Sequence, residues 1–313
     1  MNILLFRDLP AAEIDPLKRE FPAFQFRQTT RIDEVLSGPD WPEVVFGNLP
    51  SSVARQLPHL RWLQIVSSGI DDYLDLAASP ITVTTAHGLH ANIIAQHTLM
   101  MVLMFERGQS FFAAAQRQQQ WRRRPDIPRA IENLTLGLVG CGAIGRELAR
   151  IAQPLGIRVI ATKLNPAESH VPGVEKVLPW ARLDQLVAAS DHLVLALPLT
   201  ATTRHVLDAK RIRLLKADAC VHNVSRGGLI DEDALLKALQ TQRLRGASLD
   251  TFEVEPLPPD SPWWTAPHVV VTPHIAGHHR ELGRLTLERF RANLRRHASG
   301  ETLHHIARLS RGY

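Results

Sequence analysis

The sequence has few of the features that mark an exported, membrane-bound or disulfide-stabilised protein. Only two of its 313 residues are cysteines, Cys141 and Cys220, which excludes a disulfide framework and favours a reducing compartment. Its longest apolar run, residues 99–105, is far too short to cross a bilayer. Arg7 and Asp8 stand where an N-terminal export signal needs its apolar centre. These absences predict a cytoplasmic protein that does not associate with a membrane.

Long runs of like charge are also missing, and this argues against a nucleic-acid-binding protein. The net charge is +5, but the basic clusters, at 122–124 and at Arg295 and Arg296, are short and contain no interleaved aromatic residues. They are better interpreted as solvated helix ends, and as a basic rim that attracts anionic small molecules. We therefore expect no nucleic acid among the partners.

The composition is that of a globular protein, with 45% hydrophobic and 21% charged residues. A chain of 313 residues is long enough for two domains with cores of their own. In the first hundred residues, short apolar runs alternate with helical or polar segments, and this alternation is typical of a parallel sheet. The predicted strands are 3–6, 24–27, 44–47, 63–67 and 81–85.

A long helix is expected next, over about residues 91–119. Its middle, 99–105, is apolar on every side, so it should be buried on several sides at a domain junction or a subunit interface. The polar, proline-containing segment 121–128 follows and predicts a link between domains.

The strand-and-helix alternation then resumes and predicts a second unit. Its strands are expected at 134–139, 158–161, 192–197, 219–224, 247–249 and 269–272, with helices near 183–189, 231–240 and 281–297. The fold class is therefore α/β, with two doubly wound parallel-sheet domains, and the ligand of the second belongs at the carboxyl ends of its strands. The last helix lies beyond the last strand, so it can return to the first domain. We place one domain at 1–98 with 282–313, and the other at 99–281.

The glycine-rich turn after residues 134–139 predicts a dinucleotide site in the second domain. Gly140 permits a tight turn, Gly142 lets the backbone approach a diphosphate, and Gly145 lets the following helix pack closely on the strand. The helix begins at Ala143 and Ile144, so its free N–H groups would face the diphosphate. A glycine-rich turn without a ligand is the alternative, but the position between a buried strand and an amphipathic helix favours the dinucleotide.

Three polar side chains that follow strands of the second domain supply the chemistry needed to reduce a 2-keto acid. Arg226 can bind the carboxylate and polarise the keto oxygen. His274 can give that oxygen a proton as a hydride arrives. Glu255 can orient the imidazole and favour its protonated form. Taken singly, these residues have structural alternatives, namely an ion pair, a solvated loop acid and a helix cap. Their joint occurrence after a dinucleotide turn favours the chemistry.

Over residues 65–277 the chain resembles the D-isomer-specific 2-hydroxyacid dehydrogenase family, whose members include glyoxylate/hydroxypyruvate reductases and phosphoglycerate dehydrogenases. The shared segments, in the same order and at similar spacing, are 67–71, 87–97, 140–145, 197–200, 223–227, 249–256 and 272–277. The resemblance implies that Arg226, Glu255 and His274 are catalytic, and that the N–H groups of Ser68 and Gly69 hold the substrate carboxylate.

The resemblance also implies further cofactor contacts at Pro198, Thr200, Asp250 and Gly277. It makes the first unit a flavodoxin-like substrate domain and the second a Rossmann cofactor domain, in a homodimer contacted through the long helix. Gln96 stands where the family usually has Glu, and His222 stands at a strand position that is usually apolar. We have no functional interpretation of His222.

Lys163 makes NADP the preferred cofactor, with NAD possible. A Rossmann strand after the glycine turn usually ends in an acid that binds the ribose 2′-hydroxyl. Here no acid appears before Glu168, and the resemblance implies that Lys163 takes the place of the acid, as a basic residue often does in relatives that prefer NADPH. An ammonium pairs with a 2′-phosphate, and Thr162 or Asn165 could add hydrogen bonds. The alternative is a solvated lysine beside a site that accepts NADH.

The sequence therefore predicts an NAD(P)-dependent reductase of small 2-keto acids, with glyoxylate or hydroxypyruvate favoured by the compact length typical of those relatives. No metal is expected. Two alternatives remain. A formate-dehydrogenase-like enzyme is disfavoured because the histidine partner there is typically Gln, not Glu255. A dinucleotide-sensing corepressor on the same fold is disfavoured by the intact catalytic residues.

Overall fold

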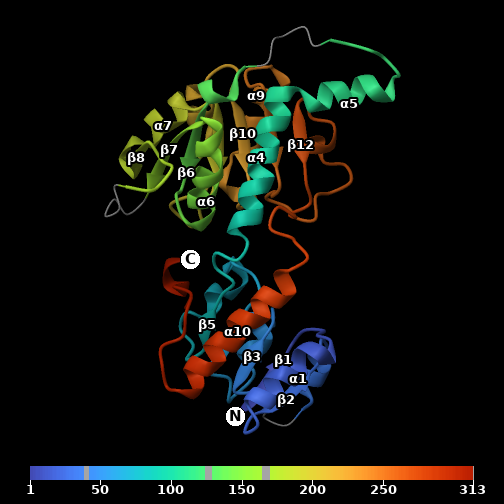
Figure 1. The fold of residues 1–313 in the computed structure, drawn as a ribbon, viewed down its shortest axis with the longest axis vertical. Helices are drawn as coiled ribbons and strands as arrows, with labels where there is room; N and C mark the ends of the chain where they lie inside the picture. The colour runs from blue at the N-terminus through green and yellow to red at the C-terminus, as the bar shows by residue number, and fades with distance from the viewer. Residues whose placement is uncertain (39–41, 124–128, 164–169, 313) are drawn as a thin grey trace. The chain divides into compact units, whose positions relative to one another are not determined.

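The computed structural model describes residues 1–38, 42–123, 129–163 and 170–312, and Figure 1 shows its ribbon. The chain forms two compact units. The first comprises Met1–His90 and His279–Tyr313, and the second comprises Ala91–His278. The sequence predicts these divisions at 98 and 281. The division after His90 keeps the helix that begins at Ala91 whole within the second unit.

The first unit contains a five-stranded parallel sheet in the order β2-β1-β3-β4-β5. Its strands are β1 Asn2–Leu5, β2 Gln25–Gln28, β3 Val44–Phe46, β4 Trp62–Gln64 and β5 Thr82–Thr84. Its helices are α1 Ala11–Glu20, α2 Ile32–Leu36, α3 Ser51–Ala54 and α10 Leu282–Ala298, with 3-10 turns η1 Asp71–Leu76 and η7 Leu309–Arg311. The five strands expected from the alternation of apolar runs are all present.

Helix α10 packs on the sheet of this first unit (Figure 1). Its buried side chains Leu287, Phe290 and Leu294 join the core cluster that contains Phe46 and Trp62. The ring of Phe290 stacks on Phe46 with centroids 4.6 Å apart. Aromatic side chains bury more apolar area than any others. These contacts bring a segment more than 200 residues away in the sequence onto the first sheet.

The second unit contains a seven-stranded parallel sheet in the order β12-β11-β10-β9-β6-β7-β8. Its strands are β6 Thr135–Val139, β7 Arg158–Lys163, β8 Lys176–Pro179, β9 His192–Leu195, β10 Cys220–Asn223, β11 Gly246–Leu249 and β12 Val269–Val271. The central strands β6, β9, β10 and β11 are buried throughout, as expected for a parallel sheet covered on both faces. The edge strand β8 was not predicted, because Leu178 is its one buried residue.

Helices cover this second sheet on both faces. They are α4 Ala91–Arg107, α5 Gln109–Arg117, α6 Ala143–Ala152, α7 Leu183–Ala189, α8 Ala209–Leu214 and α9 Glu232–Gln240. Short 3-10 turns complete the unit: η2 Ile131–Asn133, η3 Gln153–Leu155, η4 Trp180–Arg182, η5 Gly227–Leu229 and η6 Pro262–Trp264. Strands joined through helices in a parallel sheet are the doubly wound arrangement that the sequence predicted.

The prediction of a single helix over 91–119 is wrong, because the structure divides this segment into α4 and α5. Gly108 stands between them with φ of +66°, a left-handed conformation that ends α4. Burial also differs from the expectation for 99–105. Met101 and Val102 are buried, but Met100 is 46% exposed. In the described part of the chain, no helix is long and apolar enough to span a membrane.

Candidate active site

The carboxyl ends of three neighbouring strands bring the predicted catalytic residues to one edge of the second sheet. Arg226 follows β10, the loop with Glu255 follows β11, and His274 follows β12. These three strands are paired side by side in parallel. Since parallel strands end at the same edge, residues that are 48 positions apart in the sequence share one region of the unit.

A direct hydrogen bond joins His274 and Glu255. Nδ1 of His274 lies 2.7 Å from Oε2 of Glu255. The other carboxylate oxygen, Oε1, accepts a hydrogen bond from the backbone N–H of Phe252 at 2.9 Å. The carboxylate is thus held at both oxygens. Because its contact uses Nδ1, the imidazole keeps Nε2 for another group. An acid that orients a histidine in this way is the arrangement used in general acid–base catalysis.

Asp250 holds the turn that carries His274. Its buried Oδ1 accepts hydrogen bonds from Oγ1 of Thr272 at 2.6 Å and from the N–H of Ile275 at 2.9 Å. Its Oδ2 accepts from the N–H of Ala276 at 3.0 Å, and its backbone oxygen accepts from the N–H of His274 at 2.8 Å. His274 itself has φ of +53°, a conformation that few residues other than glycine adopt. The Asp250 carboxylate therefore fixes an unusual backbone at the histidine.

Arg226 lies at the start of η5, immediately after β10. Its Nη1 donates a hydrogen bond to the backbone oxygen of Ser225 at 2.6 Å. The side chain of Asn223 donates to the backbone oxygen of Arg226 at 2.8 Å, and Oγ of Ser225 donates to the oxygen of Leu197. Hydrogen bonds thus hold both the guanidinium and the backbone that carries it.

The glycine turn between β6 and α6 fits a bound diphosphate. Gly140 has φ of +93°, and a Cβ there would lie 2.6 Å from the backbone oxygen of Ala196. Gly142 has an ordinary φ of −84°, and a Cβ there would meet nothing within 4 Å. The chain therefore needs glycine at position 140 for its own fold, whereas at 142 the absent side chain leaves open space in front of α6. Helix α6 begins at Ala143 and Ile144, and Gly145 lies against the Gly140 oxygen.

Thr162 and Lys163 are the last two residues of β7, the strand beside β6. Lys163 is half-buried and pairs in register with Pro179 of β8. The hydroxyl of Thr162 is buried and has no hydrogen-bond partner in the described part of the chain. An unpartnered buried hydroxyl is costly, and a ligand that bonds it at the end of this strand would remove that cost. Asn165 and Glu168 lie outside the described residues.

Two other predicted cofactor segments are ordered by local hydrogen bonds. After β9, Oγ1 of Thr203 donates to the backbone oxygen of Pro198 and accepts from the N–H of Thr200, both at 2.7 Å. Gly277 follows the turn that Asp250 holds. Pro198, Thr200 and Gly277 thus stand at strand ends of the same sheet as the glycine turn.

In the first unit, Ser68 and Gly69 form a loop after β4. Oγ of Ser68 donates to the backbone oxygen of Ala86 at 3.2 Å, and Oγ of Ser67 donates to that of Gly69 at 3.1 Å. Among the described residues, the backbone N–H groups of Ser68 and Gly69 have no acceptor. Two adjacent N–H donors without acceptors suit a carboxylate ligand.

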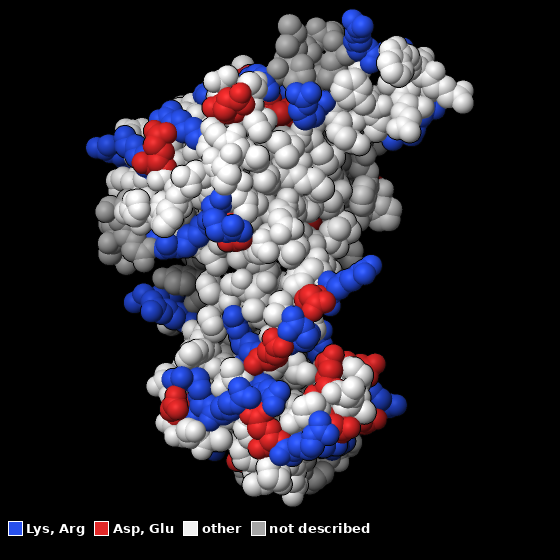
Figure 2. All heavy atoms as spheres, in the orientation of Figure 1, with Lys and Arg blue, Asp and Glu red and all other residues white. Residues whose placement is uncertain are grey.

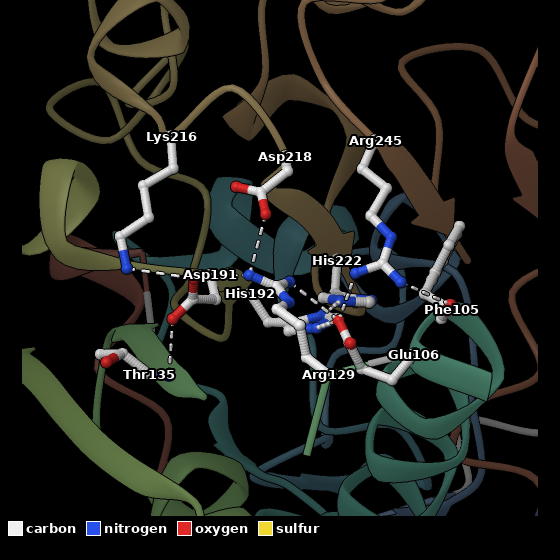
Figure 3. Close-up of polar contacts among 10 residues, drawn as sticks. All are labelled: Phe105, Glu106, Arg129, Thr135, Asp191, His192, Lys216, Asp218, His222 and Arg245. Atoms are coloured by element: carbon white, nitrogen blue, oxygen red, sulfur yellow. Dashed lines mark hydrogen bonds and ion pairs between the residues drawn. The ribbon is translucent and has the colours of Figure 1, made fainter. Parts of the chain in front are cut away.

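A buried polar network within the second unit is a feature that the sequence did not reveal. Figure 3 shows the ring of His222 against His192, and His192 against Glu106, with Arg129 and Arg245 on the carboxylate. The contacts are 2.8 Å from His222 Nε2 to His192 Nδ1 and 2.9 Å from His192 Nε2 to Glu106 Oε1. His222 Nδ1 lies 2.7 Å from Oγ of Ser248. This explains the histidine at an otherwise apolar strand position.

The charges around Glu106 determine the direction of these hydrogen bonds. Burial alone would raise the pKa of Glu106, but the hydrogen bonds from His192 and Arg129 and the charge of Arg245 lower it to about 2. The ionised carboxylate accepts from Nε2 of His192. Since a neutral imidazole carries one N–H, Nδ1 of His192 accepts from His222, and Nδ1 of His222 accepts from Ser248. Burial lowers the pKa of both histidines, that of His222 well below the usual 6.5. Both rings are therefore neutral.

Known dehydrogenases resemble this chain in sequence over most of its length. Residues 99–276 match the model of the D-isomer specific 2-hydroxyacid dehydrogenase, NAD binding domain. The (S)-sulfolactate dehydrogenase of Chromohalobacter salexigens is 35% identical over 227 residues, which are 71% of this chain and 72% of that protein. The glyoxylate/hydroxypyruvate reductase B of Citrobacter koseri is 34% identical over 235 residues, 72% of this chain and 71% of its own.

The chain belongs to the D-isomer specific 2-hydroxyacid dehydrogenase family.

A solved structure of the same family extends the likeness to the whole dehydrogenase. The enzyme from Xanthobacter autotrophicus Py2, crystallised with NADPH and MES, has a TM-score of 0.86 at 27% identity, covering 100% of this chain and 99% of that one. The resemblance found in the sequence is confirmed, as are the fold class and an enzyme of the NAD(P)-dependent type. No cluster of His, Cys, Asp or Glu suited to a metal ion occurs among the described residues.

Proposed function

We propose that this dehydrogenase reduces small 2-keto acids, glyoxylate or hydroxypyruvate, with NADPH preferred and NADH accepted. The observation that carries the proposal is the 2.7 Å hydrogen bond between Glu255 and His274, at the strand ends next to that of Arg226. The hydrogen bond orients the proton donor, and the guanidinium stands at a neighbouring strand end. These are the two groups that reduction of a 2-keto acid requires.

Each residue of the site has a distinct role in the proposed reaction. The guanidinium of Arg226 binds the carboxylate and draws electron density from the keto oxygen. A bound nicotinamide would supply the hydride that adds to C2. His274 donates its Nε2 proton to the keto oxygen, and Glu255 keeps the ring oriented through Nδ1. The N–H groups of Ser68 and Gly69 bind the carboxylate oxygens. The product is the 2-hydroxy acid, and the imidazole regains its proton from water.

The residues around the glycine turn would hold the cofactor. The open space at Gly142 admits the diphosphate against the N–H groups of α6, beginning with Ala143 and Ile144. Lys163, at the end of β7, pairs with the 2′-phosphate of NADPH, and Thr162 offers a hydroxyl. Pro198, Thr200, Asp250 and Gly277 complete the cofactor side, with Asp250 acting through the turn it holds. The NADPH in the Xanthobacter relative supports this assignment.

The enzyme is proposed to be a cytoplasmic homodimer. Large apolar side chains are exposed on α4, on α5 and in the segment after α5. Met100 is 46% exposed, Phe112 is 44% exposed and Trp121 is 99% exposed. Large apolar side chains exposed on successive segments of the chain favour a covered interface. Light scattering on the purified protein tests the dimer.

A panel of 2-keto acids with NADPH and NADH tests the proposed activity. We expect kcat/KM for glyoxylate or hydroxypyruvate to exceed that for branched or aromatic keto acids, and NADPH to be the better cofactor. Higher kcat/KM for a bulky keto acid would overturn the substrate assignment. No turnover of any keto acid, together with tight binding of the dinucleotide, would instead indicate a sensing protein.

A further inference from the structure

The loop that carries Glu255 contacts residues that have no role in the proposed reaction. It lies between β11 and η6 and contains no helix or strand. Keeping such a segment in one conformation costs conformational entropy, so other contacts must stabilise it. In this loop, the contacts come from Glu232 on α9 and from Arg204 and His205 in the segment between β9 and α8. All of these residues belong to the second unit.

The carboxylate of Glu232 holds both ends of the loop. Glu232 is the first residue of α9 and is partly buried. Its Oε1 accepts a hydrogen bond from the backbone N–H of Glu253 at 2.7 Å, and its Oε2 accepts from Nε1 of Trp263 at 3.2 Å. The rings of Trp263 and Phe252, with centroids 6.0 Å apart, add an apolar contact. Because Glu253 precedes Glu255 in the chain and Trp263 follows it, one carboxylate fixes the loop on both sides of Glu255.

The side chain of Glu253 joins the loop to the segment between β9 and α8. Its Oε1 accepts a hydrogen bond from Nη1 of Arg204 at 3.0 Å, and Nε2 of His205 lies 3.1 Å from the same oxygen. The N–H of His205 donates to the backbone oxygen of Gly228 at 2.8 Å, and His205 has φ of +48°. The segment that holds Glu253 is thus itself tied to η5, which follows Arg226.

The glycines of η5 lie directly against this contact. A Cβ at Gly227 would lie 1.9 Å from the carbonyl carbon of Phe252 and 2.2 Å from the backbone nitrogen of Glu253. A Cβ at Gly228 would lie 3.3 Å from Nη1 of Arg204. Only glycine admits so close an approach of two backbones at position 227. The segments that follow β9, β10 and β11 therefore pack together around the Glu253 side chain.

The contact between Arg204 and Glu253 is exposed, so its effect on stability should be small. The two side chains are 57% and 37% exposed, and exposed ion pairs contribute little to the free energy of unfolding. Its effect on geometry is more direct. Glu255 accepts from the N–H of Phe252 through Oε1 and contacts Nδ1 of His274 through Oε2. A shift of the backbone at 252–253 would therefore move the carboxylate relative to the histidine, and small displacements of catalytic groups lower rates strongly.

We call Arg204, Glu232 and Glu253 the loop clamp. We propose that the loop clamp positions the Glu255 carboxylate on Nδ1 of His274. This role rests on the proposed function, in which His274 gives its proton to the keto oxygen. The residues of the loop clamp are positioning residues, because they act through Glu255 and exchange no proton, electron or covalent bond with the substrate.

Replacing Glu253 by Ala tests the loop clamp. The variant removes the acceptor for Arg204 and His205 but keeps the backbone N–H that donates to Glu232. We expect kcat for glyoxylate to fall about 10-fold, with KM for NADPH and the melting temperature close to those of the wild type. Glu253→Gln keeps an oxygen acceptor, so most of kcat should return.

Glu175→Ala is the matched control. Glu175 forms an exposed ion pair with Arg158 at 2.7 Å, and Arg158 begins β7, at the edge of the sheet opposite to the strand ends that carry the site. Its loss should leave kcat at the wild-type value. Wild-type kcat in Glu253→Ala would overturn the inference.

The pH profile of kcat separates positioning from a general loss of folded enzyme. A carboxylate that no longer stays beside Nδ1 favours the imidazolium less. In Glu253→Ala, the decline of kcat at high pH should therefore begin at a lower pH than in the wild type. A purely structural loss would lower kcat equally at every pH, so a lowered kcat with an unmoved profile would also overturn the inference.

The 15N chemical shift of His274 Nδ1 reports the contact with Glu255 and needs no turnover. In histidine-labelled protein the signal is assigned by its absence in His274→Ala. It should move in Glu253→Ala and stay in place in Glu175→Ala. An unmoved signal, with keto acids still reduced by the wild type, would overturn the inference and leave the proposed function intact. If the wild type reduces no keto acid, the proposed function fails, and the chemical shift decides the positioning role by itself.

Discussion

His222 donates a hydrogen bond from Nε2 to Nδ1 of His192 across 2.8 Å, and both imidazoles are buried and neutral. The pair is anchored at one end by Glu106 and at the other by Ser248. Glu106 stands on α4, whereas His192, His222 and Ser248 stand on β9, β10 and β11. The network therefore ties the helix to strands whose ends carry Arg226 and Asp250.

This histidine pair makes stability depend on pH in a defined direction. The folded-state pKa values lie below the ordinary 6.5, so unfolding takes up protons below about pH 6.5. The contribution of the histidine pair to the free energy of unfolding is complete above pH 6.5 and is lost as the pH falls below it. Each histidine should reduce the free energy of unfolding by about 1.4 kcal/mol for each pH unit below pH 6.5. Urea unfolding between pH 8 and pH 5 measures the slope.

The matched variants for this experiment are a double replacement, His192→Leu with His222→Leu, and the exposed His59→Leu. The double variant should show a shallower decline below pH 6.5 than the wild type, because the two groups that take up protons on unfolding are gone. His59→Leu should keep the wild-type slope. A double variant with an unchanged slope would show that the pair does not set the pH dependence.

Replacing His274 by Ala should lower kcat by about 100-fold or more, because the positioned proton donor is lost. NADPH oxidation with glyoxylate gives the rate, and the neighbouring exposed His278→Ala serves as the control. Glu255→Gln keeps the size of the group bonded to Nδ1 but removes its charge, so a smaller loss of kcat is expected. Wild-type turnover in His274→Ala would show that another group supplies the proton.

Asp250→Asn separates positioning of His274 from direct cofactor binding. The amide nitrogen that replaces an oxygen would face the N–H groups of Ile275 or Ala276 without an acceptor. We expect kcat to fall about 10-fold or more with little change in KM for NADPH, and stability to fall by about 1–3 kcal/mol. Asp260→Asn, at an exposed acid, is the control. A rise in KM for NADPH with kcat retained would mean that Asp250 acts on the cofactor.

Replacement by alanine should affect different properties at two glycines of the same turn, namely cofactor binding at Gly142 and stability at Gly140. Gly142→Ala places a methyl group in open space at an ordinary φ, so its melting temperature should match the wild type, while the KM for NADPH rises about 10-fold or more. Gly140→Ala meets the Ala196 oxygen at 2.6 Å and has φ of +93°, so it should lose stability first. Thermal melts and cofactor titrations distinguish the two. A Gly142→Ala enzyme with unchanged KM would place the diphosphate elsewhere.

Lys163→Asp tests the choice of cofactor. An ammonium at the end of β7 pairs with a 2′-phosphate, whereas a carboxylate repels it and can bind a ribose hydroxyl. KM for NADPH should rise strongly, and use of NADH should stay or improve. Lys176→Asp on the neighbouring strand β8 makes the same charge change and should leave the cofactor ratio unaltered. A wild-type preference for NADH would show that Lys163 does not select the cofactor.

The sequence by itself determined the parallel α/β architecture and the glycine turn, because buried strands and amphipathic helices have local periodicities. It also pointed to Arg226, Glu255 and His274, since each belongs to a short motif that follows a predicted strand. The structure then showed that His274 and Glu255, 19 positions apart, form a direct hydrogen bond. Local pattern is sufficient for such elements because the information lies within a few residues of each site.

Only the tertiary structure decided the features that depend on distant segments. The break between α4 and α5 depends on the backbone conformation of Gly108, which the helical composition around it did not indicate. The edge strand β8 has too little apolar sequence to be recognised, and forms because β7 offers it a partner. His222 could not be interpreted from its neighbours in sequence, since Glu106, His192 and Ser248 come from other elements. The buried charge of Glu106 is stable only because the fold supplies its donors.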